Sequence, residues 1–558
     1  MTSPAGRARA GQTIAGAAVL ITVVTLASRV VGFGRWLAQA RFVGTDGVDG
    51  ALNAANFLPN LLFEVAAGGA LAGAVVPLLS GFLVRGERDK ASRTASALLG
   101  WTLTVLVPLG AVVALLAEPL VRVTGLSDPV NVSVAVDFLR VFAVQIPLYG
   151  LAVVLGGMLQ AQNRFFWQAF SPLVSSIVVI GVYARFGTLA DGNQQDVAEL
   201  SSQALGWLAW GMTAGVAFLA LPLVVPVLRT GLRLRPTLRF PDGEGRRAAR
   251  LAFAGIGALV AQQLALLATM ASGNAAGGDS TWTIFLYAQN VYFLPYAVLA
   301  FPIATSAFPR FSELASQGRR EDLARLASST TRVLVVVSAG GAAALVAAAP
   351  LVENVFDGIA QGGAAGLGAA LAWMAPGLLG YALILQLSRL LYAVDAARAA
   401  VVTTAAGWLA VVVGVGLAIP VFAGSAPGAE TRALVLAWLG GATTVGMTLA
   451  GAALLTAVRR KVGPHALSGV LRTVAVVVVA GAAGALLGRW AVPVADRAAP
   501  AGPTDGASPL DLGALLADVG LGLLAGLVAM AVVLVAAALT DATVRGRLLG
   551  LARRVARR

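Results

Sequence analysis

The chain contains no cysteine, and it has only one histidine among its 558 residues. The lack of cysteine excludes disulfides, zinc–thiolate sites and thiol nucleophiles. The single histidine, His465, stands in a basic stretch, so we interpret it as a solvated loop residue and disfavour histidine-based catalysis. There is also no glycine-rich phosphate loop, no cluster of metal ligands and no nucleophile elbow. The sequence therefore predicts a protein that is not an enzyme, with no metal and no cofactor, and it argues against an ATP-driven pump.

Charge is also scarce. Only 12% of the residues are charged, 58% are hydrophobic and the mean hydropathy is +0.83, whereas a soluble domain has about 25% charged residues. So large an apolar fraction indicates a lipid bilayer as the solvent of the chain. Every long apolar run must then be helical, because backbone polar groups in hydrocarbon need internal partners.

Apolar runs separated by polar breaks predict about fourteen transmembrane helices. They cover residues 13–40, 51–84, 94–117, 131–160, 166–184, 203–228, 250–272, 283–308, 326–350, 364–393, 399–422, 433–457, 467–488 and 512–540. If the N-terminus is cytoplasmic, most of the 40 Lys and Arg residues fall in cytoplasmic segments, including the run from Arg229 to Arg250 and the tail from Arg545 to Arg558. This bias sets orientation, so we predict that both termini are cytoplasmic. It also explains the net charge of +14 without a nucleic-acid partner.

The longest predicted loop divides these spans into two groups. It contains Pro236, Pro241 and Gly243, which are turn residues. We therefore expect an all-α polytopic protein built of a six-span half and an eight-span half, and two halves with the substrate site between them are a common transporter plan. The predicted parts are an N-lobe at 1–228 with spans one to six, a cytoplasmic linker at 229–249, a C-lobe at 250–457 with spans seven to twelve, spans thirteen and fourteen at 458–545, and a basic cytoplasmic tail at 546–558.

Span one carries charges that need an explanation, because each costs about 3 kcal/mol or more inside a membrane. Snorkelling to a headgroup suits Arg41 at the outer end, but it suits Arg29 poorly because most of the span precedes it. Ser28 and Arg35 are seven residues apart and share a helix face. We therefore predict that Ser28, Arg29 and Arg35 bind an anionic substrate.

Span two has a polar stripe. Asn53, Asn56, Asn60 and Glu64 follow one another at spacings of three, four and four residues, and Gly68 extends the stripe by a turn. Such a stripe faces either a water-filled cavity or another helix, to which it donates hydrogen bonds. The acid at its end favours the cavity, and we predict that the four polar residues contact substrate.

Further polar residues stand in other spans. Gln289 and Asn290 in span eight complete the predicted substrate-binding set, whereas Asp137 and Arg140 in span four are spaced to pair with each other. Together the polar positions predict an interior lined by spans one, two, seven and eight.

Several of these motifs resemble a known family. The sequences Ser-Arg-Val-Val-Gly-Phe-Gly-Arg at 28–35, Asn-Phe-Leu-Pro-Asn at 56–60 and Leu-Gln-Ala-Gln-Asn-Arg at 159–164 are similar to motifs of the MurJ/MviN lipid II flippases of the multidrug/oligosaccharidyl-lipid/polysaccharide exporter superfamily. Glu64 with Gly68 and Gly69 looks like the actinobacterial branch. The resemblance implies a multi-pass protein of the bacterial plasma membrane that moves lipid II to the outer face by alternating access, for cell-wall synthesis. It also implies two lobes around a central cavity, with a lipid-tail groove formed by spans thirteen and fourteen.

On this resemblance Arg29 and Arg35 hold the pyrophosphate of lipid II, which a planar guanidinium binds through paired donors. The sequence departs from the family at Phe63 and Glu64, and near Asn290, where arginines are expected. No acid in span seven matches a proposed family sodium site, so the coupling ion is open. Because the chain has no ATP-binding motif, we expect coupling to the membrane potential or to an ion gradient. The implied partners are lipid II, membrane lipids and cell-wall synthesis or division proteins.

Two other functions stay open from the sequence. The chain could export another polyprenyl-linked glycan or a drug, or it could be a non-transporting scaffold for cell-wall assembly. Arg29 and Arg35 favour an anionic lipid over a cationic drug, and a scaffold has no need of the polar stripe in span two.

Overall fold

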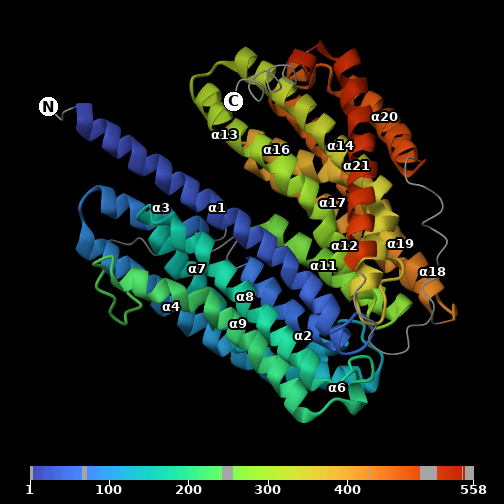
Figure 1. Cartoon of the computed structure of the whole chain (residues 1–558). Coiled ribbons are helices and arrows are strands. Elements are labelled where there is room, and N and C mark those ends of the chain that lie inside the picture. Colours follow the sequence, from blue (N-terminus) through green and yellow to red (C-terminus); the bar gives the residue numbers. More distant parts are fainter. Residues whose placement is uncertain are drawn as a thin grey trace. The chain divides into compact units, whose positions relative to one another are not determined.

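The computed structural model describes residues 4–65, 72–241, 256–426, 428–490, 512–542 and 544–546. Within these ranges the chain is almost entirely helical and forms no strand, which confirms the predicted all-α fold (Figure 1). The chain divides into two compact units, Met1–Val260 and Ala261–Arg558. The predicted boundaries of lobes, linker and tail stay predictions, and 242–249 of the linker and 547–558 of the tail lie outside the described residues.

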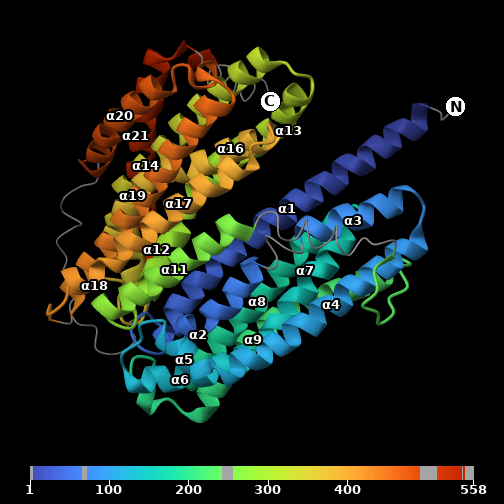
Figure 2. The ribbon, with the colours of Figure 1, turned by 180° about the vertical axis from the view of Figure 1, so that it is seen from behind.

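The first unit is a bundle in which α1 packs on α8, while α7 packs on both α4 and α9 (Figure 2). Its helices are α1 (Pro4–Phe42), α2 (Val48–Phe63), α3 (Ala72–Val84), α4 (Arg88–Leu115), α5 (Ala117–Arg122), α6 (Pro129–Phe142), α7 (Gln145–Ala161), α8 (Phe165–Leu189) and α9 (Ser202–Leu228).

The second unit contains a long helix, α14, that packs against the last two helices, α20 and α21. Its helices are α11 (Ile256–Gly277, which begins just before the boundary), α12 (Thr281–Pro295), α13 (Phe301–Ser316), α14 (Arg320–Ile359), α15 (Leu367–Met374), α16 (Leu378–Ala393), α17 (Ala397–Gly416), α18 (Ala418–Val421), α19 (Ala429–Lys461), α20 (Val470–Trp490) and α21 (Leu512–Thr540).

The long apolar helices agree with most of the predicted spans. Among the described residues ten helices are long and apolar enough to cross a membrane, or eleven if the bent pair α6–α7 is one span. They correspond to predicted spans three to six and eight to fourteen. Predicted spans one, two and seven are represented by α1, by α2 with α3, and by α11. The count of fourteen and the cytoplasmic position of both termini stay predictions.

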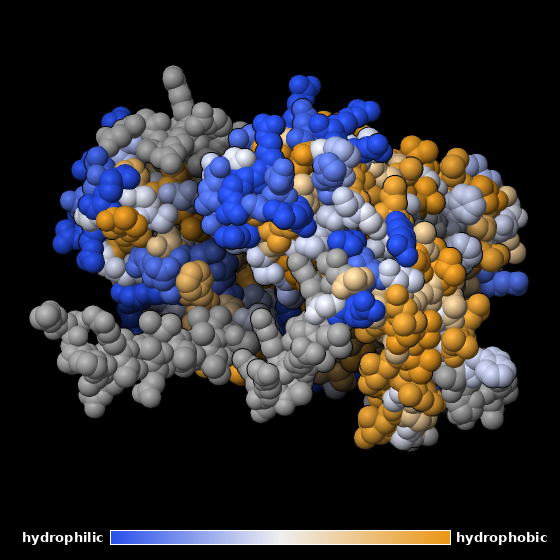
Figure 3. Space-filling view, turned by 90° about the horizontal axis from the view of Figure 1, so that it is seen from above, coloured by the Kyte–Doolittle hydropathy of each residue, from blue (hydrophilic) through white to orange (hydrophobic). Residues whose placement is uncertain are grey.

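The surface carries the apolar side chains that lipid contact requires. Leu471, Val479, Leu486 and Trp490 of α20 are all largely exposed, and so are Leu516 and Leu527 of α21. Figure 3 shows wide hydrophobic areas, in orange, with hydrophilic residues gathered in separate blue patches. These exposed apolar faces fit a protein whose solvent is lipid.

The predicted span over 131–160 consists of two helices, α6 and α7, which meet at a bend of 41°. Pro147 has no N–H with which to bond the carbonyl of Ala143, four residues earlier. That carbonyl instead accepts a hydrogen bond from the N–H of Ile146 at 3.3 Å. Before the bend, Asp137 and Arg140 form the predicted ion pair at 3.0 Å, with most of both side chains exposed.

Candidate functional site

The two predicted arginines lie on α1, which is one continuous helix from Pro4 to Phe42. Six residues at about 100° per residue place Arg29 and Arg35 on different sides of this helix. Arg29 is exposed, whereas Arg35 and Ser28 are half-buried. Arg35 also stands 5.3 Å from the ring centre of Trp36. No residue in the described ranges forms an ion pair with Arg29 or Arg35, so both charges are available to a ligand.

The start of the polar stripe on α2 is engaged with neighbouring helices. Asn53 is buried, and its Oδ1 accepts a hydrogen bond from Nε2 of Gln39 on α1 at 3.2 Å. The hydroxyl of Tyr183 on α8 donates to Oε1 of Gln39 at 3.3 Å. Asn53 therefore helps to hold α1, α2 and α8 together, which is the hydrogen-bonding role that polar residues take between membrane helices.

The middle of the stripe meets α7. The hydroxyl of Tyr149 donates to Oδ1 of Asn60 at 3.0 Å. The ring of Phe63 lies 4.5 Å from the ring of Tyr149, centre to centre. Tyr149 thus joins α7 to two residues of α2.

Two members of the stripe keep polar atoms that other groups do not use. The Oδ1 of Asn56 is buried and has no hydrogen-bond partner among the described residues. The side chain of Glu64 is exposed at the end of α2. Gly68, which would extend the stripe, lies outside the described residues. Asn56 and Glu64 are accordingly the members of the stripe with polar atoms that no described residue engages.

Tyr149 and Tyr183 also contact this group of residues, at Asn60 and at Gln39, and neither tyrosine was predicted from the sequence. Each is an isolated tyrosine in an apolar helix, and a buried tyrosine hydroxyl usually has a hydrogen-bond partner. That signal could have found them. Their helices, α7 and α8, correspond to predicted spans four and five, which were not among the spans expected to line the polar interior.

The predicted residues of the second unit lie on α12. Nδ2 of Asn290 donates to the carbonyl of Leu286 at 2.7 Å, so its amide is bonded within its own helix. Gln289 lines a cavity of about 20 Å³ with Thr269, Tyr292 and Tyr381. That volume has room for about one water. The hydroxyl of Tyr292 is buried there without a partner among the described residues.

Comparison with known proteins gives a family. The model of the family described as lipid II flippase MurJ matches residues 39–494. A probable lipid II flippase MurJ of Rhizobium meliloti is 29% identical over 311 residues, which cover 54% of this chain and 55% of that protein. The lipid II flippase MurJ of Burkholderia cenocepacia is 28% identical over 305 residues, covering 53% and 56%. The chain spans about half the length of the curated relatives it matches.

Solved structures show the same fold. A lipid II flippase MurJ in an inward closed conformation has a TM-score of 0.68 at 15% identity, over 92% of this chain and 98% of that one. An inward-facing multidrug resistance MATE family transporter of the MOP superfamily has a TM-score of 0.60 at 16% identity, over 79% and 98%. With its long apolar helices and a family match over most of its length, this multi-pass membrane protein belongs to the lipid II flippase MurJ family.

Proposed function

We propose that the chain is a lipid II flippase, which carries the lipid-linked peptidoglycan precursor from the cytoplasmic to the outer face of the plasma membrane by alternating access. Family membership supports the class of protein, and the names of the matched relatives support the substrate. The observation that carries the proposal is the pair of charges on α1. Arg29 and Arg35 stand in a long apolar helix and have no ion-pair partner in the described ranges.

The chemistry of these charges suits a pyrophosphate. A guanidinium is planar, always charged and donates hydrogen bonds in pairs, so it binds phosphate oxygens well. Gln39 and Asn53 join α1 to α2, and we propose that polar groups of the bound head reach from Arg35 on α1 to Asn56 and Glu64 on α2. Ser28, Asn53, Asn60, Gln289 and Asn290 belong to the same proposal in a secondary role, because Asn53, Asn60 and Asn290 already have protein partners.

We propose that the protein transports without catalysing a reaction and without a cofactor. An anion that leaves a cytoplasm at negative potential moves downhill, and the potential supplies about 2.3 kcal/mol per charge per 100 mV. The membrane potential can therefore drive outward movement of lipid II, with or without an ion gradient.

Reconstitution tests this function. Purified protein in vesicles should move fluorescent lipid II across the bilayer, and the double variant R29A/R35A should move it at least about tenfold more slowly, because a hydrogen bond to a charged group contributes about 1.5–3 kcal/mol. The matched control is R140A, which removes an exposed, paired arginine on α6. Equal rates in the wild-type and the double variant would contradict the proposal, and so would depletion in cells without accumulation of lipid II on the cytoplasmic face.

One observation favours a second candidate function. Phe63 packs on Tyr149, and Asn290 bonds its own helix. The resemblance leads us to expect arginines at Phe63 and near Asn290, so two expected cationic contacts are missing. The chain could therefore carry a different polyprenyl-linked glycan. Competition in the same vesicles between lipid II and such a glycolipid decides between the two.

A further inference from the structure

The last two helices pack very closely on each other and on α14. A Cβ placed on Gly484 of α20 would lie 2.6 Å from the carbonyl oxygen of Ala529 on α21, and one on Gly488 would lie 2.5 Å from that of Ala525. A Cβ on Gly526 would lie 3.3 Å from the Cβ of Ala344 on α14. The three backbones approach one another through small residues, as membrane helices commonly do.

This packing repeats along the helices. Gly484 and Gly488 are four residues apart, and so are Ala525 and Ala529, so a slip by one helical turn keeps one glycine–alanine contact and sets the other glycine against Leu521 or Val533. Membrane helices gain no hydrophobic energy from associating, because lipid is as apolar as their side chains. The register of α21 therefore rests on van der Waals packing together with its polar contacts.

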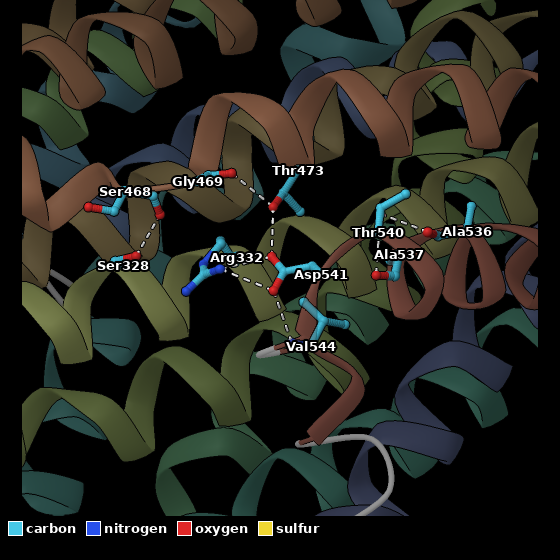
Figure 4. Close-up of polar contacts among 10 residues, drawn as sticks. All are labelled: Ser328, Arg332, Ser468, Gly469, Thr473, Ala536, Ala537, Thr540, Asp541 and Val544. Atoms are coloured by element: carbon cyan, nitrogen blue, oxygen red, sulfur yellow. Dashed lines mark hydrogen bonds and ion pairs between the residues drawn. The ribbon is translucent and has the colours of Figure 1, made fainter.

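A polar cluster just after the end of α21 adds an ion pair and hydrogen bonds to this packing (Figure 4). Nη1 of Arg332 on α14 donates to both carboxylate oxygens of Asp541, at 3.0 Å each, just after α21 ends. The hydroxyl of Thr473 on α20 donates to Oδ2 of Asp541 at 3.1 Å, and the N–H of Val544 donates to Oδ1 at 3.3 Å. Only 18% of the Arg332 side chain and 10% of the Asp541 side chain are exposed.

The residues just before α20 pack against this ion pair and against α14. Gly469 has φ +74°, and a Cβ there would lie 3.3 Å from Nη1 of Arg332. The hydroxyl of Ser328, one turn before Arg332 on α14, donates to the carbonyl of Ser468 at 2.7 Å. The start of α20 and the end of α21 are thus both fixed to the same turns of α14.

We propose that the Arg332–Asp541 pair locks the register of α21 against α14. A slip by one turn moves Asp541 about 5.4 Å along the axis and leaves two charges without partners in a low-dielectric environment. Removing the partner of a buried charge is strongly destabilising, whereas a buried polar pair specifies one alignment among several similar ones. On the proposed function, Arg332 and Asp541 are positioning residues that keep α20 and α21 in place beside the path of the lipid tail.

Disulfide cross-linking tests the register directly, because the chain has no cysteine of its own. A Cβ on Gly340 of α14 would lie 3.9 Å from the Cβ of Met530 on α21, which is a good disulfide distance. The pair G340C/M530C therefore reports the observed register. The pairs G340C/G526C and G340C/L534C report a slip by one turn in either direction.

We expect the full-length protein in membranes to form the 340–530 disulfide at least severalfold faster than the two offset disulfides. The apolar replacement R332M/D541L leaves no charge to bury, so it should insert and fold, but it should divide its cross-links between the observed and an offset register. The reversed pair R332D/D541R should restore the 340–530 cross-link. The control is R325Q, which breaks an exposed ion pair two turns earlier on α14 and should change nothing.

An R332M/D541L variant that keeps the 340–530 cross-link alone would overturn the lock, and so would a reversed pair that fails to restore it. Lipid II translocation by the same proteins is measured separately. A wild-type protein that cross-links in one register but moves no lipid II would refute the proposed function and leave the lock standing. If the proposed function holds, R332M/D541L should also raise the lipid II concentration that gives half-maximal transport.

Discussion

At the scale of single residues, one polar stripe serves two purposes. Asn53 and Asn60 lie on the same face of α2, but their amide oxygens accept hydrogen bonds from Gln39 and Tyr149 on other helices. Asn56, between them, keeps a buried oxygen without a partner in the described ranges. A spacing of three and four residues identifies the face of a helix, but only the neighbouring helices determine which members of that face are already bonded.

The bond between Tyr149 and Asn60 leads to a prediction about stability. The substitution Y149F keeps the ring against Phe63 but removes the hydroxyl, and it should cost about 1 kcal/mol because the oxygen of Asn60 loses its donor. The thermal midpoint of the purified protein should therefore fall. N60A and the double variant Y149F/N60A complete the cycle. Effects of the two single substitutions that add up in the double variant would contradict a direct bond.

At the scale of elements, the sequence predicted most helices but not their breaks. The apolar run over 131–160 reads as one span, yet Pro147 divides it into α6 and α7 at 41°. Most of the other long runs became single helices or closely joined pairs. A proline inside a run is visible in the sequence, but the same residue can be accommodated without a large bend, as Pro108 is within α4. The packing around the proline decides the angle.

The close approach of α20 and α21 gives a prediction at this scale. G484A should destabilise the protein by about 1–3 kcal/mol, because the new methyl group meets the backbone of α21 and must push the helices apart. G520A on α21 is the matched control, since a Cβ there meets nothing within 4 Å. Alanine forms helices better than glycine, so G520A should be neutral or slightly stabilising. Thermal unfolding of both variants in detergent tests the difference. If G484A and G520A lost equal stability, Gly484 would not be more closely packed than Gly520.

At the scale of the whole molecule, the distribution of charge is the strongest signal. The 40 Lys and Arg residues exceed the 26 acids, and most of them fall in segments that the predicted topology places in the cytoplasm. The same bias is the basis for predicting cytoplasmic termini. A periplasmic reporter fused to either end should therefore be inactive, whereas a cytoplasmic reporter should be active.

The direction of transport predicts how the transport rate depends on the membrane potential. In vesicles that hold the protein and lipid II, a negative potential on the lipid II side should speed its departure, because the transported head is anionic and moves toward positive potential. Collapsing the potential with an ionophore should slow the movement. Reversing the potential should slow it further. A rate that does not depend on the potential would show that an ion gradient or the lipid II gradient drives the movement instead.

The sequence by itself determined the solvent, the helical class and most of the spans, because these depend on local composition: apolar runs of sufficient length in lipid can only be helices. Its short motifs also led to the family. Tertiary structure decided which polar residues are paired. It joined Asp541 to Arg332 across 209 positions, and it placed Tyr149 and Tyr183 beside residues of α1 and α2. Such contacts depend on how helices far apart in the sequence pack together. Helical periodicity shows which residues share a face of one helix, but it does not show which other helix packs against that face.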